Sequence, residues 1–562
     1  MSRFIERLVD TARTSPRGIV VGEPRAPMRY PWSQVHARAR TIAGALVDQH
    51  SDVGEHGDGI GAVAILAGEP ELIAPAAQAV WLAGGSVTML HQPTPRTDLE
   101  MWADDTIHVL DMIGAKLVLL GKPFDALAPV LEQHGIAYRT IDGLLSTAEP
   151  IGEPVARQED DPALLQLTSG STAEPKAVRI THGNLFANMT SMALAAKLDA
   201  SSDTMVSWLP LFHDMGMVGF LTVPMTLGIE LVKVTPVEFL SAPLCWPELI
   251  TKYHGTITAA PNFAWAMIGR RLAKADDGAY DLSRLRIALN GAEPIDVAAV
   301  RAFVDAGERF GMRPGCVLPA YGMAEATLAV AFNPLDRGLV VDHVDAHALE
   351  HDKRANPLRA NESSRVNESS ESADARSFAL LGPPLPGLEV DVIDDAGRRL
   401  GDREVGQLRI RGEAVTPGYL TVDGPVSTLD SDGWLRTGDL GYLVDGEVVV
   451  CGRIKDVIIM GGRNIYPTDI ERAACSVDGV RAGNAVAVRI DAGTKRERFA
   501  VVLESSIAGD EPAETLLRKE VTGAVVDAVG VRPFAVLVLG KGKLPKTPSG
   551  KLRRAAAADL VS

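Results

Sequence analysis

The chain has 562 residues, with 56 basic and 72 acidic side chains and a formal net charge of -16. This length exceeds what one hydrophobic core supports, so we expect two or more domains. The acidic excess argues against nucleic-acid binding, which requires clustered Lys and Arg to neutralise phosphates. Four widely spaced cysteines and the charged start MSRFIERLVD favour a cytoplasmic protein with no transmembrane segment.

The first half of the chain has the pattern of an α/β fold. Short apolar runs, such as GAVAILAG at 61–68 and KLVLLG at 116–121, alternate with longer stretches at helical spacing. This alternation is typical of βαβ units and mostly parallel sheets.

A loop rich in small hydroxylated residues follows the apolar run ALLQL, within LTSGSTAEPKAV at 167–178. Such residues allow backbone amides and hydroxyls to converge on phosphate oxygens, and Lys176 adds a positive charge. The segment therefore predicts a phosphate-binding loop, although a Ser/Thr/Gly loop taken alone is more often an ordinary surface turn. It matches neither GxxxxGKS nor GxGxxG, which weakens the kinase and dehydrogenase interpretations.

The pattern changes after about residue 380. Alternating segments separated by Asp-Gly or Ala-Gly turns predict antiparallel hairpins in a β-rich subdomain at about 380–454. The preceding stretch, about 342–377, is polar and repeats NESS at 361 and 367, so we expect a mobile surface insertion. From Lys455 onward a small α/β pattern ends in a Lys-rich tail, which predicts a large domain at 1–454 and a small lid domain at 455–562.

Six further motifs follow the Ser/Thr/Gly loop. In chain order they are WLPLFHDMGMVG (208–219), NGAEP (290–294), AYGMAEAT (320–327), GWLRTGDLGY (433–442), GRIKDVIIMGGRNIYPTDIE (452–471) and PKTPSGKLRR (545–554). The series resembles the adenylate-forming superfamily of acyl-CoA synthetases, luciferase-like enzymes and nonribosomal adenylation domains. LLQLTSGST, APNFAWAM, YGMAEATLAV and the added segment between Ala331 and Pro386 are most similar to the mycobacterial-type fatty acyl-AMP ligases.

The resemblance implies a multidomain α/β fold. Its large N-terminal domain would combine α/β subdomains with a β-barrel-like subdomain, followed by a small mobile C-terminal α+β domain. Lys455 would be the hinge between the two domains, and Gly461 and Gly462 would border the path of an incoming thiol.

The resemblance also implies site residues. ATP phosphates are assigned to Thr168, Ser169, Gly170, Ser171, Thr172 and Lys176, the adenine end to Gly291, Ala292, Glu293, Tyr321 and Gly322, and the ribose to Asp439 and Arg453. Lys551, Glu325 and Thr172 would be catalytic, with Glu325 reaching Mg²⁺, which prefers oxygen ligands. His213 matches the mouth of the acyl pocket, and a packed core histidine is an equal alternative.

The implied function is activation of a fatty acid by ATP and Mg²⁺ to an acyl-adenylate, with release of pyrophosphate. The acyl group would then pass to the phosphopantetheine thiol of an acyl carrier protein. Coenzyme A is the alternative acceptor, and a non-catalytic adenylate-binding protein is a third hypothesis, because Ala173 and Ala177 stand where the family usually has glycine. Phe239, Trp246, Phe263 and Trp265 are candidate acyl-pocket walls, but the sequence does not separate walls from core.

Charge is distributed unevenly along the chain. Lys455 to Ser562 contains 17 basic and 13 acidic residues, whereas the preceding part contains 39 basic and 59 acidic residues. Residues 541–554 contain six Lys or Arg and no acid. This pattern suits a basic lid that meets a triphosphate or an acidic carrier protein, and a solvated tail with one functional lysine is the alternative.

Overall fold

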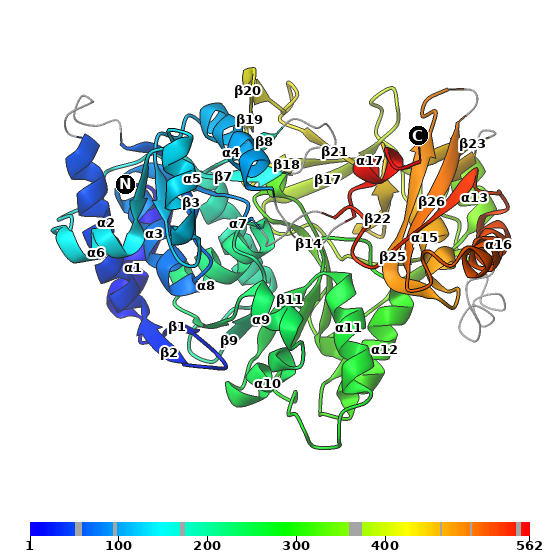
Figure 1. The fold of residues 1–562 in the computed structure, drawn as a ribbon, viewed down its shortest axis with the longest axis horizontal. Coiled ribbons are helices and arrows are strands. Elements are labelled where there is room, and N and C mark those ends of the chain that lie inside the picture. Colours follow the sequence, from blue (N-terminus) through cyan, green and yellow to red (C-terminus); the bar gives the residue numbers. More distant parts are fainter. Residues whose placement is uncertain are drawn as a thin grey trace.

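The fold is that of a computed structural model, which describes residues 1–562 except 51–58, 94–97, 169–174, 359–373, 461–462, 495–496, 547–551 and 562. Two eight-stranded sheets and a four-stranded antiparallel sheet form the larger part of the molecule (Figure 1). Residues after β22 form a smaller body at the other end from the N-terminus (Figure 1). None of the described helices combines the length and hydrophobicity that crossing a bilayer requires.

The first large sheet has the strand order β14-β13-β12-β11-β9-β10-β1-β2. Its six strands from β13 to β1 run parallel, and β2 and β14 are antiparallel edges. The strands are β1 Gly18–Val21, β2 Met28–Pro31, β9 Thr204–Ser207, β10 Glu230–Lys233, β11 Ile257–Ala260, β12 Ile287–Asn290, β13 Val317–Gly322 and β14 Ala329–Phe332. The carboxyl ends of β11, β12 and β13 therefore meet at one edge, where α/β sheets bind ligands.

The second large sheet has the order β20-β19-β8-β7-β4-β3-β5-β6. Its strands are β3 Gly61–Leu66, β4 Gly85–Met89, β5 Val118–Leu120, β6 Tyr138–Thr140, β7 Pro162–Thr168, β8 Lys176–Thr181, β19 Gly418–Thr421 and β20 Gly424–Ser427. The apolar runs at 61–68 and 116–121 form parallel neighbours in it, which confirms the α/β prediction for the first half.

Helices cover both large sheets and separate them. They are α1 Arg3–Thr14, α2 Trp32–His50, α3 Pro70–Leu82, α4 Leu99–Ile113, η1 Phe124–Leu127, α5 Ala128–Gln133, α6 Ile141–Thr147, α7 His182–Ala195, η2 Met215–Thr222, α8 Val223–Leu227, α9 Pro236–Ser241, α10 Cys245–Lys252, α11 Asn262–Leu272, α12 Val297–Glu308, η3 Pro314–Cys316 and η4 Ala324–Ala326. One core connects them and contains Trp81, Trp246 and Trp265.

The β-rich segment contains the expected antiparallel strands. The four-stranded sheet has the order β17-β18-β21-β22, with β17 Leu388–Ile393, β18 Gly406–Gly412, β21 Leu435–Val444 and β22 Glu447–Arg453. Asp445 and Gly446 connect β21 to β22 with positive φ angles, as a tight hairpin turn requires. One expectation is wrong, because the β19–β20 hairpin leaves this subdomain and extends the second large sheet by pairing with β8.

The predicted mobile insertion is also partly wrong. The described parts of 342–377 contain regular structure, because β15 Val341–Asp345 pairs with β16 Ala375–Ala379 and α13 Ala346–His351 follows β15. Both NESS repeats lie outside the described residues. The polar composition misled the prediction, since the polar groups find buried partners. Glu350 and Arg376 are each 4% exposed and form an ion pair of 2.7 Å.

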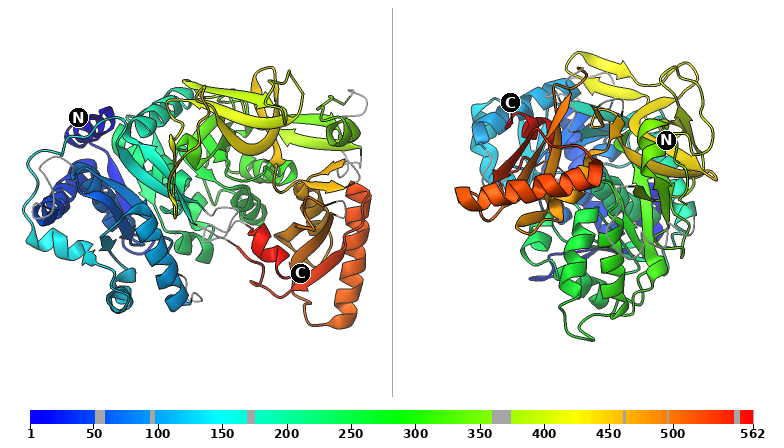
Figure 2. Two further views of the ribbon diagram at one scale, coloured as in Figure 1. Left: turned by 90° about the horizontal axis from the view of Figure 1, so that it is seen from above. Right: turned by 90° about the vertical axis from the view of Figure 1, so that its right-hand side faces the viewer.

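The smaller body contains a three-stranded sheet of β25 Val480–Ile490, β26 Arg498–Ser505 and β27 Ala535–Leu539, and a hairpin of β23 Ile458–Met460 and β24 Arg463–Ile465. Its helices are α15 Pro467–Cys475, α16 Glu511–Val529 and α17 Arg554–Ala558. Alternation along the strands gives the sheet two apolar faces. One packs against α15 and α16 and the other against the C-terminal segment, with α16 on the outer side (Figure 2).

Four charged side chains connect the insertion to the smaller body. Arg376 forms ion pairs with Glu350 and with Asp469 of α15, the second at 2.6 Å. Arg463 of β24 reaches the other oxygen of Glu350 at 2.6 Å and donates to the Val529 carbonyl at the end of α16. The proposed domain boundary at residue 454 lies between β22 and β23, and stays a prediction.

Candidate active site

A cavity of about 1600 Å³ opens at the carboxyl ends of β11, β12 and β13. The β21–β22 hairpin and the Tyr419 ring contribute further walls, and the smaller body contributes residues of α15, β25 and the C-terminal segment. The cavity contains most of the described residues that the sequence assigned to nucleotide binding. These are Thr168, Lys176, Gly291, Ala292, Glu293, Tyr321, Gly322, Glu325, Asp439 and Arg453.

Tyr321, Asp439 and Arg453 form one connected group. The Tyr321 hydroxyl donates to Asp439 Oδ2 at 2.6 Å, and Arg453 Nε lies 3.2 Å from Asp439 Oδ1. Strand register brings them together, because Asp439 on β21 is directly opposite Arg453 on β22. Burial raises the pKa of the Asp439 carboxyl, while Arg453 and the Tyr321 hydrogen bond oppose that shift. The result is a buried acceptor flanked by a cation, which can receive hydroxyl groups.

Glu325 lies in η4, directly after β13. The Tyr419 hydroxyl donates to Glu325 Oε1 at 2.7 Å, and Lys176 Nζ lies 5.4 Å from the centre of the Tyr419 ring. The backbone is also held in place, because Thr416 donates its amide to the Glu325 carbonyl. Thr327 follows with φ of 69°, a conformation that β-branched residues rarely adopt, and its hydroxyl donates to the Ala414 carbonyl.

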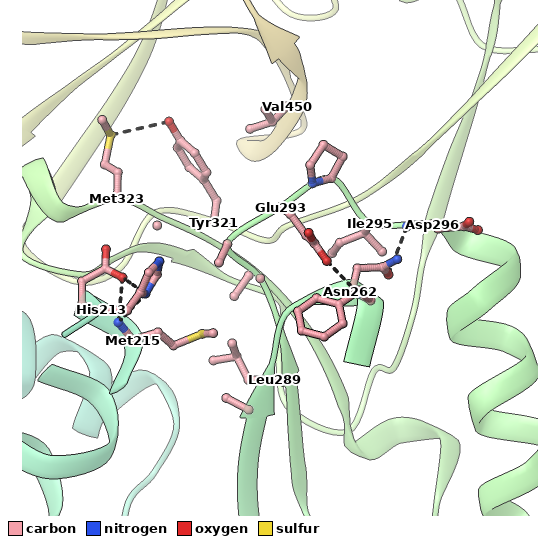
Figure 3. Close-up of a pocket in the computed structure, with 18 of the residues that line it drawn as sticks. His213, Met215, Asn262, Leu289, Glu293, Ile295, Asp296, Tyr321, Met323 and Val450 are labelled. Carbon is pink, nitrogen blue, oxygen red and sulfur yellow. Dashed lines mark hydrogen bonds and ion pairs between the residues drawn. The ribbon is translucent and has the colours of Figure 1, made fainter. Parts of the chain in front are cut away.

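The NGAEP loop follows β12. Ala292 has φ of 71°, and the Glu293 carboxylate accepts the Phe263 amide at 2.7 Å, which fixes the loop to the start of α11. The Asn262 side-chain oxygen accepts from Asn290 and from the Asp296 amide. Figure 3 shows Glu293 and Asn262 on one side of the cavity and Tyr321 on the other.

His213 lines the cavity and its side chain is 21% exposed. Its Nδ1 lies 2.6 Å from Asp214 Oδ1, which also accepts the Met215 amide at 2.7 Å. Figure 3 shows His213 beside Met215. Between the two sequence hypotheses, the geometry favours the pocket position. The segment that carries His213 is held by Gln166, a buried residue that donates to the Phe212 carbonyl at 3.0 Å.

The smaller body presents cations to the same cavity. Lys455, Lys546, Arg481 and Arg554 are among its lining residues. Lys546 Nζ donates to Asn484 at 2.8 Å, and Arg554 forms a two-pronged ion pair with Glu471 at 2.7 and 2.9 Å. Desolvation lowers the pKa of Lys455, an exposed residue two positions after β22. Basic side chains of the smaller body therefore lie at the cavity, and their role toward a triphosphate or a carrier protein stays a prediction.

Several predicted residues lie outside the described residues. They are Ser169, Gly170, Ser171, Thr172, Ala173, Gly461, Gly462 and Lys551. Lys455 as a hinge also stays a prediction, since one conformation does not test motion. The concern about Ala177 is wrong, because Ala177 is a buried β8 residue paired with Leu167 and Leu420 and does not have positive φ.

Sequence reasoning missed Tyr419, Gln166 and Lys546. Only the order of motifs could have indicated Lys546, which lies in PKTPSGK. Tyr419 is identified only by the pairing of β19 with β8, and Gln166 only by its hydrogen bond to the Phe212 carbonyl. Among the four aromatic candidates for the pocket, Phe263 lines the cavity. Phe239, Trp246 and Trp265 instead pack in the core behind the lining, where Phe239 stacks on the lining residue Trp208 with ring centroids 4.0 Å apart.

Comparison with known proteins decides the family. The AMP-binding enzyme family matches residues 9–420. The chain belongs to this family. It is 54% identical to Rv1013 of Mycobacterium tuberculosis, a protein named as a ligase, over 100% of both chains.

Two further relatives of this AMP-binding enzyme carry names with a substrate. JamA of Moorena producens, named a medium-chain fatty acid acyl-carrier-protein ligase, is 34% identical and covers 71% of this chain and 67% of its own. A solved structure from work on fatty acyl-adenylate ligases from E. coli and L. pneumophila has a TM-score of 0.88 at 29% identity, and covers 100% of this chain and 98% of that chain. The overall α/β fold with a C-terminal body is therefore that of an adenylate-forming enzyme.

Proposed function

We propose that this AMP-binding enzyme is a fatty acyl-AMP ligase that loads an acyl carrier protein. The observation that carries the proposal is the single cavity in which Glu325, Asp439, Arg453 and Lys176 lie at one end and apolar side chains at the other. Such a cavity accommodates a nucleotide triphosphate and an alkyl chain together. The similarity to JamA and to the fatty acyl-adenylate ligase structure supports the same assignment.

In the first step a carboxylate oxygen of the acid bonds to the α-phosphorus of ATP, and the bond from that phosphorus to the bridging oxygen breaks to release pyrophosphate. Two anions must approach each other, so cations that face the reacting groups lower the barrier. Arg453 and Lys176 lie at the cavity, and Lys551 is assigned to this role by sequence. Asp439 would hold the ribose hydroxyls.

The described residues fit a divalent cation at one position. Glu325 offers a carboxylate, the ligand type that Mg²⁺ prefers, in a cavity whose lysine and arginine side chains would hold the phosphates. When bound there, Mg²⁺ would neutralise phosphate charge. Tyr419 would orient the Glu325 carboxylate through its hydroxyl.

In the second step the thiol sulfur bonds to the acyl carbonyl carbon, and the bond to the phosphate oxygen breaks to release AMP. A phosphopantetheine arm on a carrier protein and coenzyme A present the same thiol. A product assay distinguishes them, with ATP, Mg²⁺, a panel of fatty acids and either holo carrier protein or coenzyme A. We expect acyl-carrier product and little acyl-CoA, and rapid stoichiometric acyl-CoA would contradict the proposal.

Acid-dependent exchange of pyrophosphate into ATP tests the first step alone. Lys551→Ala should lower that exchange by about 100-fold or more while ATP binding is retained. Lys541→Ala, in the same basic segment, is the matched control and should have little effect. Absence of exchange with every acid would instead favour the non-catalytic hypothesis.

A further inference from the structure

The apolar end of the cavity lies on one face of the first sheet. Side chains alternate along strands, so residues two apart share a face. The lining residues follow this rule, with Ile257 and Ala259 on β11, Ile287 and Leu289 on β12, and Leu318 and Ala320 on β13. The intervening residue Thr258 has its hydroxyl on the other face, where it accepts a hydrogen bond from Trp246 at 2.9 Å.

Strand register arranges these side chains in levels. Ile257 lies opposite both Met205 and Ile287, which gives a lower level at the amino ends of β9, β11 and β12. Leu289 lies opposite Ala259 and Leu318, which gives a middle level. Gly291 follows β12 at the nucleotide end, so the levels lead from the proposed reaction centre into the core.

The opposite wall comes from α7 and η2. Met192, Ala196 and Leu198 line the cavity from the end of α7 and the turn after it, and Met215, Gly219 and Phe220 from η2. Met192, Met205, Phe220 and Ile287 are all less than 9% exposed. This end of the cavity therefore lies between the sheet and the helices, and Figure 3 shows Leu289 and Met215 below Tyr321 in the view.

A polar cluster closes the cavity beneath the lower level. Arg286, directly before Ile287, donates to both oxygens of Asp203 at 2.8 and 2.6 Å, and Asp203 is 1% exposed. The same guanidinium donates to the Ala196 and Lys197 carbonyls at 2.8 and 3.1 Å. The Thr256 hydroxyl, directly before Ile257, donates to Asp203. A longer alkyl chain would have to displace these paired groups, and a buried charge left without its partner is costly.

The depth from Gly291 to the lower level sets the length of the acid. Four residue steps along β12 at about 3.3 Å each give a depth of about 13 Å. An extended alkyl chain advances about 1.3 Å per carbon, because its bonds of about 1.5 Å zigzag. The depth therefore accommodates about ten carbons.

We propose that the enzyme selects medium-chain acids of roughly eight to twelve carbons, and that Met205, Ile257 and Ile287 above the Arg286–Asp203 pair determine the upper limit. The proposal rests on the proposed function and specifies its substrate. It predicts that the lower level limits the length of the alkyl chain, because strand pairing fixes the positions of its side chains.

The test is pyrophosphate exchange with saturated acids of four to eighteen carbons. The wild-type enzyme should prefer about ten carbons. An optimum outside the range of about eight to twelve carbons, or equal rates from six to sixteen, would overturn the chain-length inference and leave the proposed function intact. No exchange with any acid would overturn both.

Two variants move the limit in opposite directions. Ala259→Leu fills the middle level, and should lower the rate with decanoate at least about tenfold while butyrate, which ends above that level, changes little, since one or more methylenes in an apolar pocket change rates by this much. Ile287→Ala removes a floor side chain, and should move the optimum up by about two carbons. Retained activity with butyrate shows that each variant is folded.

Val317→Ala is the matched control, because Val317 lies on β13 with its side chain on the opposite face of the sheet and is not a lining residue. Its chain-length profile should be that of the wild type. Equal loss with all acids in Ala259→Leu, or an unchanged profile in both variants, would show that these levels do not contact the substrate.

Discussion

The two ends of the cavity are built in different ways. The nucleotide end combines side chains from β13, η4, β19, β21 and β22 with cations of the smaller body, and Tyr321 and Asp439 are 118 positions apart in sequence. The apolar end uses side chains of adjacent parallel strands, whose register is fixed by backbone hydrogen bonds. The first end is therefore assembled by tertiary contacts between loops, whereas the second follows from the sheet itself.

This difference predicts that reactivity and the proposed chain-length selection are separable. Substitution of polar loop residues should leave the depth of the apolar end unchanged. Substitution of the strand residues should leave Asp439 and Glu325 in place.

The largest expected effect concerns the floor of the apolar end. Asp203→Asn should lower the free energy of unfolding by about 3 kcal/mol, because Arg286 then loses its buried partner. Urea denaturation measures this change. Asp105→Asn, at an exposed residue of α4, is the control and should stay within about 0.5 kcal/mol of the wild type. Equal stability of the two variants would show that the pair does not support the floor.

The next effect concerns the nucleotide end. Asp439→Ala should lower pyrophosphate exchange by about 100-fold with every acid, because the ribose loses a preorganised acceptor. The chain-length profile should not change. Asp423→Ala, an exposed aspartate in the β19–β20 turn, should retain full exchange. A changed chain-length preference in Asp439→Ala would contradict the separation of the two ends.

A smaller effect concerns the stability of the whole fold and involves neither end of the cavity. His182, which is fully buried and hydrogen-bonded to Ser2 at 3.0 Å, has its pKa lowered by burial to about 4. The unfolded chain then binds a proton that the folded protein does not, so stability should fall by about 2 kcal/mol between pH 7 and pH 5. His182→Gln should reduce this loss, as measured by denaturation at both pH values. His108→Gln, at an exposed histidine on α4, should not, and identical pH dependence in all three proteins would contradict the assignment.

The smallest effect concerns the support of Glu325. Tyr419→Phe removes one hydrogen bond to a carboxylate, and should lower exchange roughly tenfold and raise the Mg²⁺ concentration needed for nucleotide binding. Titration of ATP binding against Mg²⁺ measures the second effect without turnover. Tyr138→Phe is the matched control, because the Tyr138 hydroxyl also donates to a glutamate at 2.7 Å, on an exposed surface far from the cavity. Equal behaviour of the two variants would remove Tyr419 from this role.

Much of the nucleotide end could be predicted from the sequence because its residues occur in recognisable motifs. Asp439, Arg453, Tyr321 and Glu325 all line the cavity as expected. Tyr419 could not be predicted, because its position depends on a hairpin that pairs with β8 rather than with its sequence neighbours.

The apolar end had no motif. Apolar residues give the same sequence pattern whether they line a pocket or pack in a core. The sequence therefore could not distinguish Trp246, which packs in the core, from Ile257, which lines the cavity. The insertion was misread for a related reason. Composition identified its polarity but not the partners that bury Glu350 and Arg376.

The pairing of β19 with β8 has a consequence for biosynthesis. The strand that completes this edge of the second sheet emerges from the ribosome some 240 residues after β8, whose outer edge is unpaired until then. At roughly 5–20 residues per second, the delay is on the order of 12–50 s. During this time β8 is an open strand edge of the kind that pairs with other chains. Nascent chains shorter than about residue 427 should therefore be the species most prone to aggregate.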